Sequence, residues 1–215
     1  KRKITTTKTT DIKQEVSVIK AGEQFSINAS TGVLQQGSKN INVRINAPVI
    51  IQEAVKDEHH VETNTIRKKR GGVTGFVSSC FGGNSKKEIY HNSSSLISKG
   101  SENNGDSFIA NALNRFKAIG SRFGSLKTEI SAGSEISIQV SNNAYQSQTQ
   151  SKSSGLVWNK VKSRFETHLT NSNPVFENLT HLHAPNVILE KVRGSANSFR
   201  NLRSNTPITI KEVSD

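Results

Sequence analysis

A short motif that returns along the chain is the sequence feature that most constrains its fold. Ile27-Asn28-Ala29 returns 18 residues later as Ile45-Asn46-Ala47. Around it apolar residues alternate with polar ones, as at Ile41, Val43 and Ile45, and this is the period of a half-buried β-strand. An 18-residue interval is too long for a simple hairpin and fits one coil of a β-solenoid, whose rungs bury apolar residues against their neighbours. The repeat therefore predicts a mainly β solenoid.

Longer similarities support this interpretation. The pattern I-x-A-G-x-x-Φ-S-I occupies residues 19–27 and 130–138, the segment 47–51 is matched at 184–189, and Φ-x-S-R-F occurs at 119–123 and 161–165. Hydrophobic residues make up only 32% of the 215 residues, which suits a thin core. Because the sequence contains no methionine, we expect it to be part of a longer chain or the product of processing.

Two regions interrupt the strand pattern. Residues 55–105 are polar and basic, and we expect a protruding, partly mobile loop or hairpin there. Residues 106–125 carry apolar side chains three and four apart, which predicts an amphipathic helix; these are Ile109, Ala112, Leu113, Phe116, Ile119 and Phe123. A weaker pattern predicts a short helix at 156–165. Solenoid coils are expected at 1–54 and 126–215.

The formal net charge of +12 favours attraction to acidic partners. The candidate polyanion-binding residues are Arg67, Lys68, Lys69, Arg70, Lys86 and Lys87. A simply solvated basic loop is the alternative. Specific nucleic-acid binding is not expected, because aromatic residues make up only 6% of the chain. The predicted helix carries Arg115, Lys117 and Arg122 and could contact a membrane weakly, although such a helix more often packs on its own protein.

No catalytic, cofactor or metal site is expected. His59-His60 follow Asp57 and Glu58, but adjacent histidines usually point to opposite sides and the H-E-x-x-H spacing is absent; a solvated polar turn is the alternative. His181 and His183 lack a third ligand nearby in the sequence, and the single Cys80 belongs to no nucleophile signature. The S-x-x-K at 17–20 lacks its companion motifs. We therefore expect a noncatalytic protein without a cofactor, and no run of about 18 apolar residues predicts a membrane span.

Several of these segments together resemble a known family. They are Thr5–Asp11, the I-x-A-G motif with the strand at 27–29, Leu34–Ser38, Asp57–His60, and the basic run 67–70 that closes on Gly71-Gly72. This succession resembles the haemagglutinin repeats of two-partner-secreted exoproteins, which include the filamentous haemagglutinins and the contact-dependent growth inhibition proteins. The resemblance covers residues 1–85 best, and it returns more weakly at 126–157 and 179–193.

The resemblance implies a right-handed parallel β-helix in a large protein that is secreted or displayed on a Gram-negative cell surface. The expected function is a noncatalytic stalk or delivery segment for adhesion or contact-dependent growth inhibition. The implied partners are the outer-membrane transporter of the two-partner system and a target-cell surface or glycan. The alternative is a direct adhesin that binds sulfated glycan or another polyanion through the basic loop.

Overall fold

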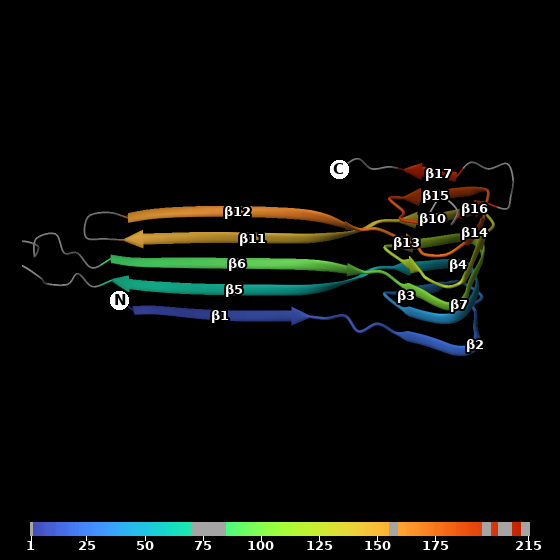
Figure 1. The fold of residues 1–215 in the computed structure, drawn as a ribbon, viewed down its shortest axis with the longest axis horizontal. Helices are drawn as coiled ribbons and strands as arrows, with labels where there is room; N and C mark the ends of the chain where they lie inside the picture. The colour runs from blue at the N-terminus through green and yellow to red at the C-terminus, as the bar shows by residue number, and fades with distance from the viewer. Residues whose placement is uncertain (1, 70–84, 155–158, 195–198, 202–207, 212–215) are drawn as a thin grey trace, which may run out of the picture. The chain divides into compact units, whose positions relative to one another are not determined.

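The computed structural model describes residues 2–69, 85–154, 159–194, 199–201 and 208–211 (Figure 1). Of these residues 82% lie in strands and none lies in a helix, so the prediction of a mainly β chain is confirmed. The described part of the chain thus contains no helix long and apolar enough to cross a membrane. The chain divides into two compact units, which are described separately.

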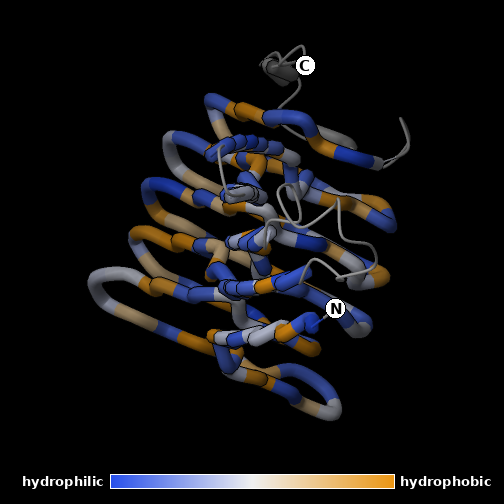
Figure 2. Tube along the Cα trace, turned by 90° about the vertical axis from the view of Figure 1, so that its left-hand side faces the viewer, coloured by the Kyte–Doolittle hydropathy of each residue, from blue (hydrophilic) through white to orange (hydrophobic). Residues whose placement is uncertain are grey.

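The parallel unit comprises residues 14–57, 97–143 and 170–215. Its first strands are β2 (Val18–Asn28), β3 (Val33–Gln36), β4 (Lys39–Glu53), β7 (Glu102–Ile119), β8 (Arg122–Phe123) and β9 (Lys127–Ala132). They are followed by β10 (Glu135–Gln139), β13 (Val175–Phe176), β14 (Thr180–His183), β15 (Asn186–Glu190), β16 (Phe199–Asn201) and β17 (Ile208–Lys211). All the strand pairings that the structure gives for this unit are parallel. Successive turns of the chain lie one above another (Figure 2).

The 18-residue repeat corresponds to neighbouring levels of this stack. Ile27 pairs with Ile45, and Asn28 pairs with Asn46. The same position continues through later strands, from Ile45 to Ala110, then Ile130, then Leu182. The side chains of Ile45, Ala110, Ile130 and Leu182 are all fully buried. The repeat read from the sequence is therefore a structural equivalence.

The longer repeat does not share this equivalence. Ile27 ends the first I-x-A-G copy and is level with Ile130 in the ladder, but Ile130 begins the second copy. The two copies are thus out of register with each other. A short apolar motif can occur at different positions in the strand ladder, because such positions require only alternating apolar residues and one small residue.

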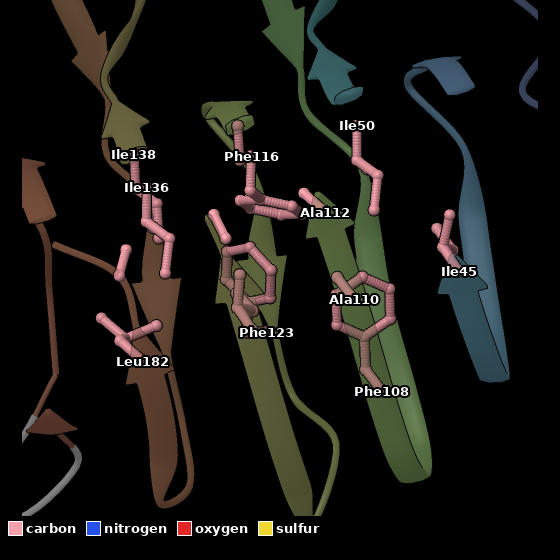
Figure 3. Close-up of a cluster of buried hydrophobic side chains, with 14 of the residues drawn as sticks. Ile45, Ile50, Phe108, Ala110, Ala112, Phe116, Phe123, Ile136, Ile138 and Leu182 are labelled. Carbon is pink, nitrogen blue, oxygen red and sulfur yellow. The ribbon is translucent and has the colours of Figure 1, made fainter. Parts of the chain in front are cut away.

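The core of the parallel unit is a thin column of aliphatic and aromatic side chains (Figure 3). Phe123 stacks on Phe176 with ring centroids 4.6 Å apart, and Phe108 contacts Phe123 at 5.9 Å. These rings come from different levels, so each level is buried by the next. Burying one such ring contributes about 2 to 3 kcal/mol, which makes continued stacking the main source of stability.

Polar residues are stacked in the same way. Asn46 Nδ2 donates to Asn28 Oδ1 at 2.7 Å, and Asn111 Nδ2 donates to Asn46 Oδ1 at 2.8 Å. A second network is fully enclosed and joins the side-chain amides of Gln35, Asn40, Gln52 and Asn103. Because a shift by one residue would leave these buried amides without partners, the networks fix the register of the coils.

The antiparallel unit comprises residues 1–13, 58–96 and 144–169. Its sheet has the order β1 (Arg2–Ile12), β5 (Val55–Lys69), β6 (Ser85–Lys99), β11 (Ser141–Ser154) and β12 (Asn159–Ser172), and the ends of the last four strands belong to the parallel unit. The five strands lie side by side (Figure 1). Among its described residues only Ser147 is buried, so both faces of this sheet are largely open to water.

The prediction of an amphipathic helix at 106–125 is wrong. These residues form most of β7 and all of β8. Phe108, Ala110 and Ala112 are buried with period two, as are Phe116 and Ala118, and a corner separates the two runs. The corner leaves Leu113 74% exposed. Two short alternating runs joined by a corner therefore mimic helical spacing.

The prediction of a short helix at 156–165 is also wrong for the residues that the structure describes, since β12 begins at Asn159. Val161 and Phe165 lie four apart on one face of a strand. The observed units also differ from the predicted segments 1–54, 55–105, 106–125 and 126–215. Residues 1–13 and 144–169 belong to the antiparallel sheet with 58–96.

Candidate polyanion-binding site

The predicted cationic residues gather at one end of the antiparallel sheet. Arg67, Lys68 and Lys69 end β5, whereas Lys86 and Lys87 stand at the start of β6. Because β5 and β6 are neighbours in the sheet, the fold brings the two basic runs together. Arg70 lies outside the described residues.

The first strand of the chain adds two cations. Arg2 pairs with Lys68, and Lys3 pairs with Arg67. A groove of about 570 Å³ lies at this end of the sheet; it is lined by Arg2, Lys3, Arg67, Lys68, Lys69, Ser85, Lys86, Lys87 and Ser153. Seven of its nine lining residues are cationic and none is acidic, so the groove suits an anionic ligand.

Strand alternation divides these cations between the two faces of the sheet. Lys3 and Arg67 share one face, on which Lys69 also lies, and Arg2 and Lys68 share the other. The charge of Lys68 reaches Glu88 and lowers its pKa. Because β5 ends at Lys69 where its neighbour β6 begins at Ser85, we assign Glu88 to the face of Lys68. Lys87 is adjacent to Glu88 in β6 and therefore lies on the face of Lys3 and Arg67, which we call the basic face.

The edge strand β12 extends the basic face. Ser147 Oγ donates to Glu166 Oε2 at 3.4 Å, and Tyr145 stacks on His168. Ser147 and Tyr145 pair with the odd-numbered residues of β6, on the side of Lys87. Alternation from Glu166 then places the exposed cations of β12 on the basic face as well; these are Lys160, Lys162 and Arg164.

The other face, which we call the opposite face, is electrostatically mixed. Glu88 is ion-paired with Lys86. The hydrogen bond from Lys86 is the largest cause of the lowered pKa of Glu88, and the charges of Lys86, Lys152 and Lys68 add to it. Glu88 thus stays ionised and neutralises part of the positive charge there. The basic face also holds two acidic residues: Asp11 on β1, and Glu166 on β12, which is ion-paired with Arg164.

This arrangement can bind a linear polyanion without forming any covalent bond to it. Lys3, Arg67 and Lys87 belong to three adjacent strands, whose spacing is about 4.8 Å. All three side chains are exposed and can adapt to sulfate or phosphate groups. Contacts of this kind are mainly electrostatic, so they weaken steadily as salt is added.

The histidines do not converge on a metal site. The His59 ring is hydrogen-bonded through Nδ1 to the carboxylate of Asp11, and His60 Nε2 lies 3.3 Å from Glu62 Oε1. The register of β1 and β5 places His59 and His60 on opposite faces. Within the part of the chain that the structure describes, no three His, Cys, Asp or Glu residues form a group that could hold a metal ion.

Among the described residues, the other metal-ligand and nucleophile candidates of the sequence analysis do not lie in the polyanion-binding site. His181 and His183 alternate with the buried residues Thr180 and Leu182, so both point out of the coil. Cys80 lies outside the described residues. Ser17 precedes β2, and Lys20 lies exposed on it.

The basic helix predicted at 106–125 is not formed, so the weak membrane contact proposed for that helix loses its structural basis. Arg115 and Lys117 lie on β7, and Arg122 lies on β8. Arg115 Nε is 3.4 Å from Glu135 Oε1, and Arg122 is ion-paired with Glu177. These two cations are therefore tied to neighbouring coils.

Sequence reasoning missed the cations on β1 and β12. Arg2 and Lys3 are 64 or more residues from their partners Lys68 and Arg67, and nothing local indicates that pairing. The alternation of Lys160, Lys162 and Arg164 with uncharged residues was a usable signal, because it indicates a strand with one basic face.

Comparison with known proteins assigns this chain to no family. The chain matches no protein-family model, and neither the search of curated proteins nor the search of solved structures finds a match.

Proposed function

We propose that this chain is a noncatalytic stalk or delivery segment of a large secreted bacterial exoprotein. The parallel unit would be a right-handed parallel β-helix, as the resemblance to haemagglutinin repeats implies. The parent protein would leave a Gram-negative cell through its outer-membrane transporter and would carry an adhesive or growth-inhibiting activity elsewhere in its chain. The observation that supports this most is the equivalence of Ile45, Ala110, Ile130 and Leu182 on successive levels.

The mechanism of such a segment is mechanical. Each level adds about 4.8 Å of length and is held by backbone pairing and by the side chains of the next level. The stacked amides of Asn28, Asn46 and Asn111 add a second tie along the same direction. A unit of this kind needs no reaction centre, because its function is to hold other parts of the chain at a distance.

Duplication of one coil tests this proposal. A second copy of residues 120–139 inserted after Gln139 joins at the same corner that Gly120 already forms after Ile119. We expect a folded protein whose melting temperature, measured by circular dichroism, equals or exceeds that of the original chain. In the secreted parent, the adhesive or inhibitory activity should stay within about twofold, since stalk function tolerates small changes in length.

The control inserts a shuffled version of the same residues at the same place. It should lower the melting temperature, because its apolar residues no longer match the ladder. Equal destabilisation by the two insertions would overturn the repetitive stalk. A folded duplicate whose parent loses activity would show instead that this segment itself carries the activity.

The basic face favours a second candidate function, which is adhesion to a sulfated glycan or another linear polyanion. Lys3, Arg67 and Lys87 supply cations from three neighbouring strands, and Lys160, Lys162 and Arg164 supply three more on the edge strand. A groove beside these strands is free of acidic side chains. This role is compatible with a stalk, since a stalk can also bind along its length.

Binding to immobilised heparin at rising salt tests the second function. The double variant Arg67→Gln/Lys87→Gln should bind about tenfold more weakly at about 0.15 M salt, because each lost phosphate or sulfate contact removes part of an additive electrostatic energy. The matched control is Lys20→Gln/Lys56→Gln, which removes the same charge from exposed positions of the parallel unit. Equal weakening in both variants would mean that only net charge matters.

A further inference from the structure

The edge strand β12 is self-complementary. Among the described strands it has a single neighbour, β11, so the backbone groups along its other side are unpaired. Val161, Phe165 and Leu169 are 60%, 66% and 74% exposed and lie four residues apart on the opposite face of the sheet. A long exposed edge with an apolar stripe is a template for another strand.

We propose that β12 pairs with β12 of a second copy of this chain across a two-fold axis at Phe165, extending the sheet from five strands to ten. The pairing is antiparallel, as a two-fold axis perpendicular to the sheet requires. This inference does not depend on the proposed stalk or polyanion function.

The side chains select this register. With Phe165 opposite Phe165 of the second copy, Val161 stands opposite Leu169 and the apolar stripes meet on one face. On the basic face Arg164 stands opposite Glu166 of the second copy. Each Arg164 is already ion-paired with Glu166 of its own strand, so two such pairs form a closed group of alternating charge.

A shift of the register by two residues separates the apolar side chains and places two like charges opposite each other, although one of the two shifts also brings Lys162 opposite Glu166. A shift of the pairing by two residues in one direction brings Arg164 opposite Arg164 and places Phe165 opposite Ser163. A shift by two in the other direction brings Glu166 opposite Glu166 and places Phe165 opposite Thr167. Like charges directly opposite are destabilising, whereas apolar pairs and opposite charges each stabilise the pairing.

Charge matching also selects the occupant. Lys162 stands opposite His168, and Lys160 stands opposite Thr170, so the cations of one strand never face those of the other. The strand β1, which forms the other edge of the sheet, offers only Ile4 and Ile12 as exposed apolar residues and carries Lys3 and Lys8. A second copy of β12 therefore matches this edge better than β1 does.

Sedimentation of the full chain over a range of concentrations tests the proposal. We expect a reversible monomer–dimer equilibrium, and Phe165→Lys should weaken the dimer at least about tenfold, because two charges would meet at its centre. The matched control is Leu113→Lys, which places the same charge at another exposed apolar residue, in the parallel unit, and should leave the equilibrium unchanged.

A charge exchange fixes the register. Arg164→Glu alone should weaken the dimer, since it places a second carboxylate opposite Glu166, and the double variant Arg164→Glu/Glu166→Arg should restore it. A chain that stays monomeric at every concentration would overturn the proposal, as would open-ended growth beyond the dimer or a double variant that fails to restore it. Circular dichroism of each variant separates loss of pairing from loss of fold.

Discussion

At the scale of single residues, two glycines from the same sequence motif have different constraints. A Cβ atom on Gly133 would lie 1.9 Å from the carbonyl oxygen of Leu113, whereas one on Gly22 would meet nothing within 4 Å. Gly133 stands where the backbone of a neighbouring strand approaches closely. The sequence alone treats the two positions as equal, and only the difference in register between the copies distinguishes them.

We expect Gly133→Ala to destabilise the protein by more than about 2 kcal/mol, because backbone rather than a flexible side chain must move. Chemical denaturation measures this change. Gly22→Ala is the matched control and should change the free energy of unfolding by less than about 0.5 kcal/mol. Similar values for the two variants would contradict the placement of Gly133 against Leu113.

A second residue-scale prediction concerns Glu88. Its pKa lies below the ordinary value of 4.5 because Lys86 donates a hydrogen bond to it and nearby lysines attract its charge. The folded state therefore favours the ionised carboxylate, and this stabilisation is present above pH 4.5 and is lost as the pH falls through the lowered pKa. Glu88→Gln should bind heparin a few-fold more tightly at neutral pH, because it frees Lys86, which lines the cationic groove.

The tighter heparin binding of Glu88→Gln should persist below pH 4.5. It should vanish once the Glu88 carboxyl group of the original chain is protonated. Glu62→Gln removes the same charge further along β5, opposite Lys8, and serves as the control. Heparin affinity measured from neutral to acidic pH compares the variants. An equal gain for both would show that Glu88 has no special relation to the cations.

At the scale of elements, the strands of the parallel unit were predictable and those of the antiparallel unit largely were not. Val43 and Ile45 alternate with polar residues because a core lies on one side of their strand, whereas Ile41 is not among the buried residues. The strand β11 faces water on both sides, so its run of Ser, Gln and Asn carries no apolar alternation from which a strand could be read. Helical spacing in β7 arose for a related reason, since a corner shifted the alternation midway.

The candidate site was predictable to the same extent. Local runs of Arg and Lys indicated the cations of β5 and β6. The cations of β1 and β12 join them only through strand pairings between distant parts of the chain, which no local pattern encodes.

The corners of the coils allow a prediction about one hairpin. Gly37-Ser38 and Gly120-Ser121 each join one level to the next, and the amides of Gly37 and Gly120 donate to Glu53 and Gln139 of the following level at 2.9 and 2.8 Å. Both glycines have positive φ, 57° and 61°, which suits them to a tight turn. The segment 140–174, which includes all of β11 and β12, follows Gln139 at the equivalent place.

Replacing residues 140–174 by Gly-Ser should therefore leave the parallel unit folded, with a melting temperature within a few degrees of the original. The control removes an equal length shifted back by three residues, 137–171, and so deletes the buried Ile138. It should unfold at a clearly lower temperature, because a large core side chain is lost. Unfolding of both variants would mean that the hairpin is needed for the coil.

At the scale of the whole molecule, the two units differ in how they are stabilised. Every buried hydrophobic residue in the described part of the chain belongs to the parallel unit. The antiparallel sheet is held by backbone pairing and by contacts between exposed side chains, such as Thr5 with Thr65. A sheet without a covered face opens at low cost.

Hydrogen exchange followed by mass spectrometry should therefore find two levels of protection. Amides in 43–52, 108–118 and 130–138 should exchange more slowly than those in 2–12, 85–96 and 144–154, by at least about tenfold. Both sets are hydrogen-bonded strands, so the comparison isolates the effect of the core. Equal exchange rates in the two sets would contradict the prediction that the core makes the parallel unit more resistant to opening.

The base of the first hairpin has a consequence for the order in which the chain folds. Lys99 Nζ lies 2.5 Å from Asp57 Oδ2, so the two ends of a long excursion are fastened together. The pairing of β4 with β7 would otherwise have to close a loop of several dozen free residues, at an entropic cost that grows with loop length. Once β5 has paired with β6, the start of β7 lies close to the end of β4, so the loop that remains to be closed between them is short. We therefore expect the pairing of β5 with β6 to speed the pairing of β4 with β7, because it shortens the loop that must close.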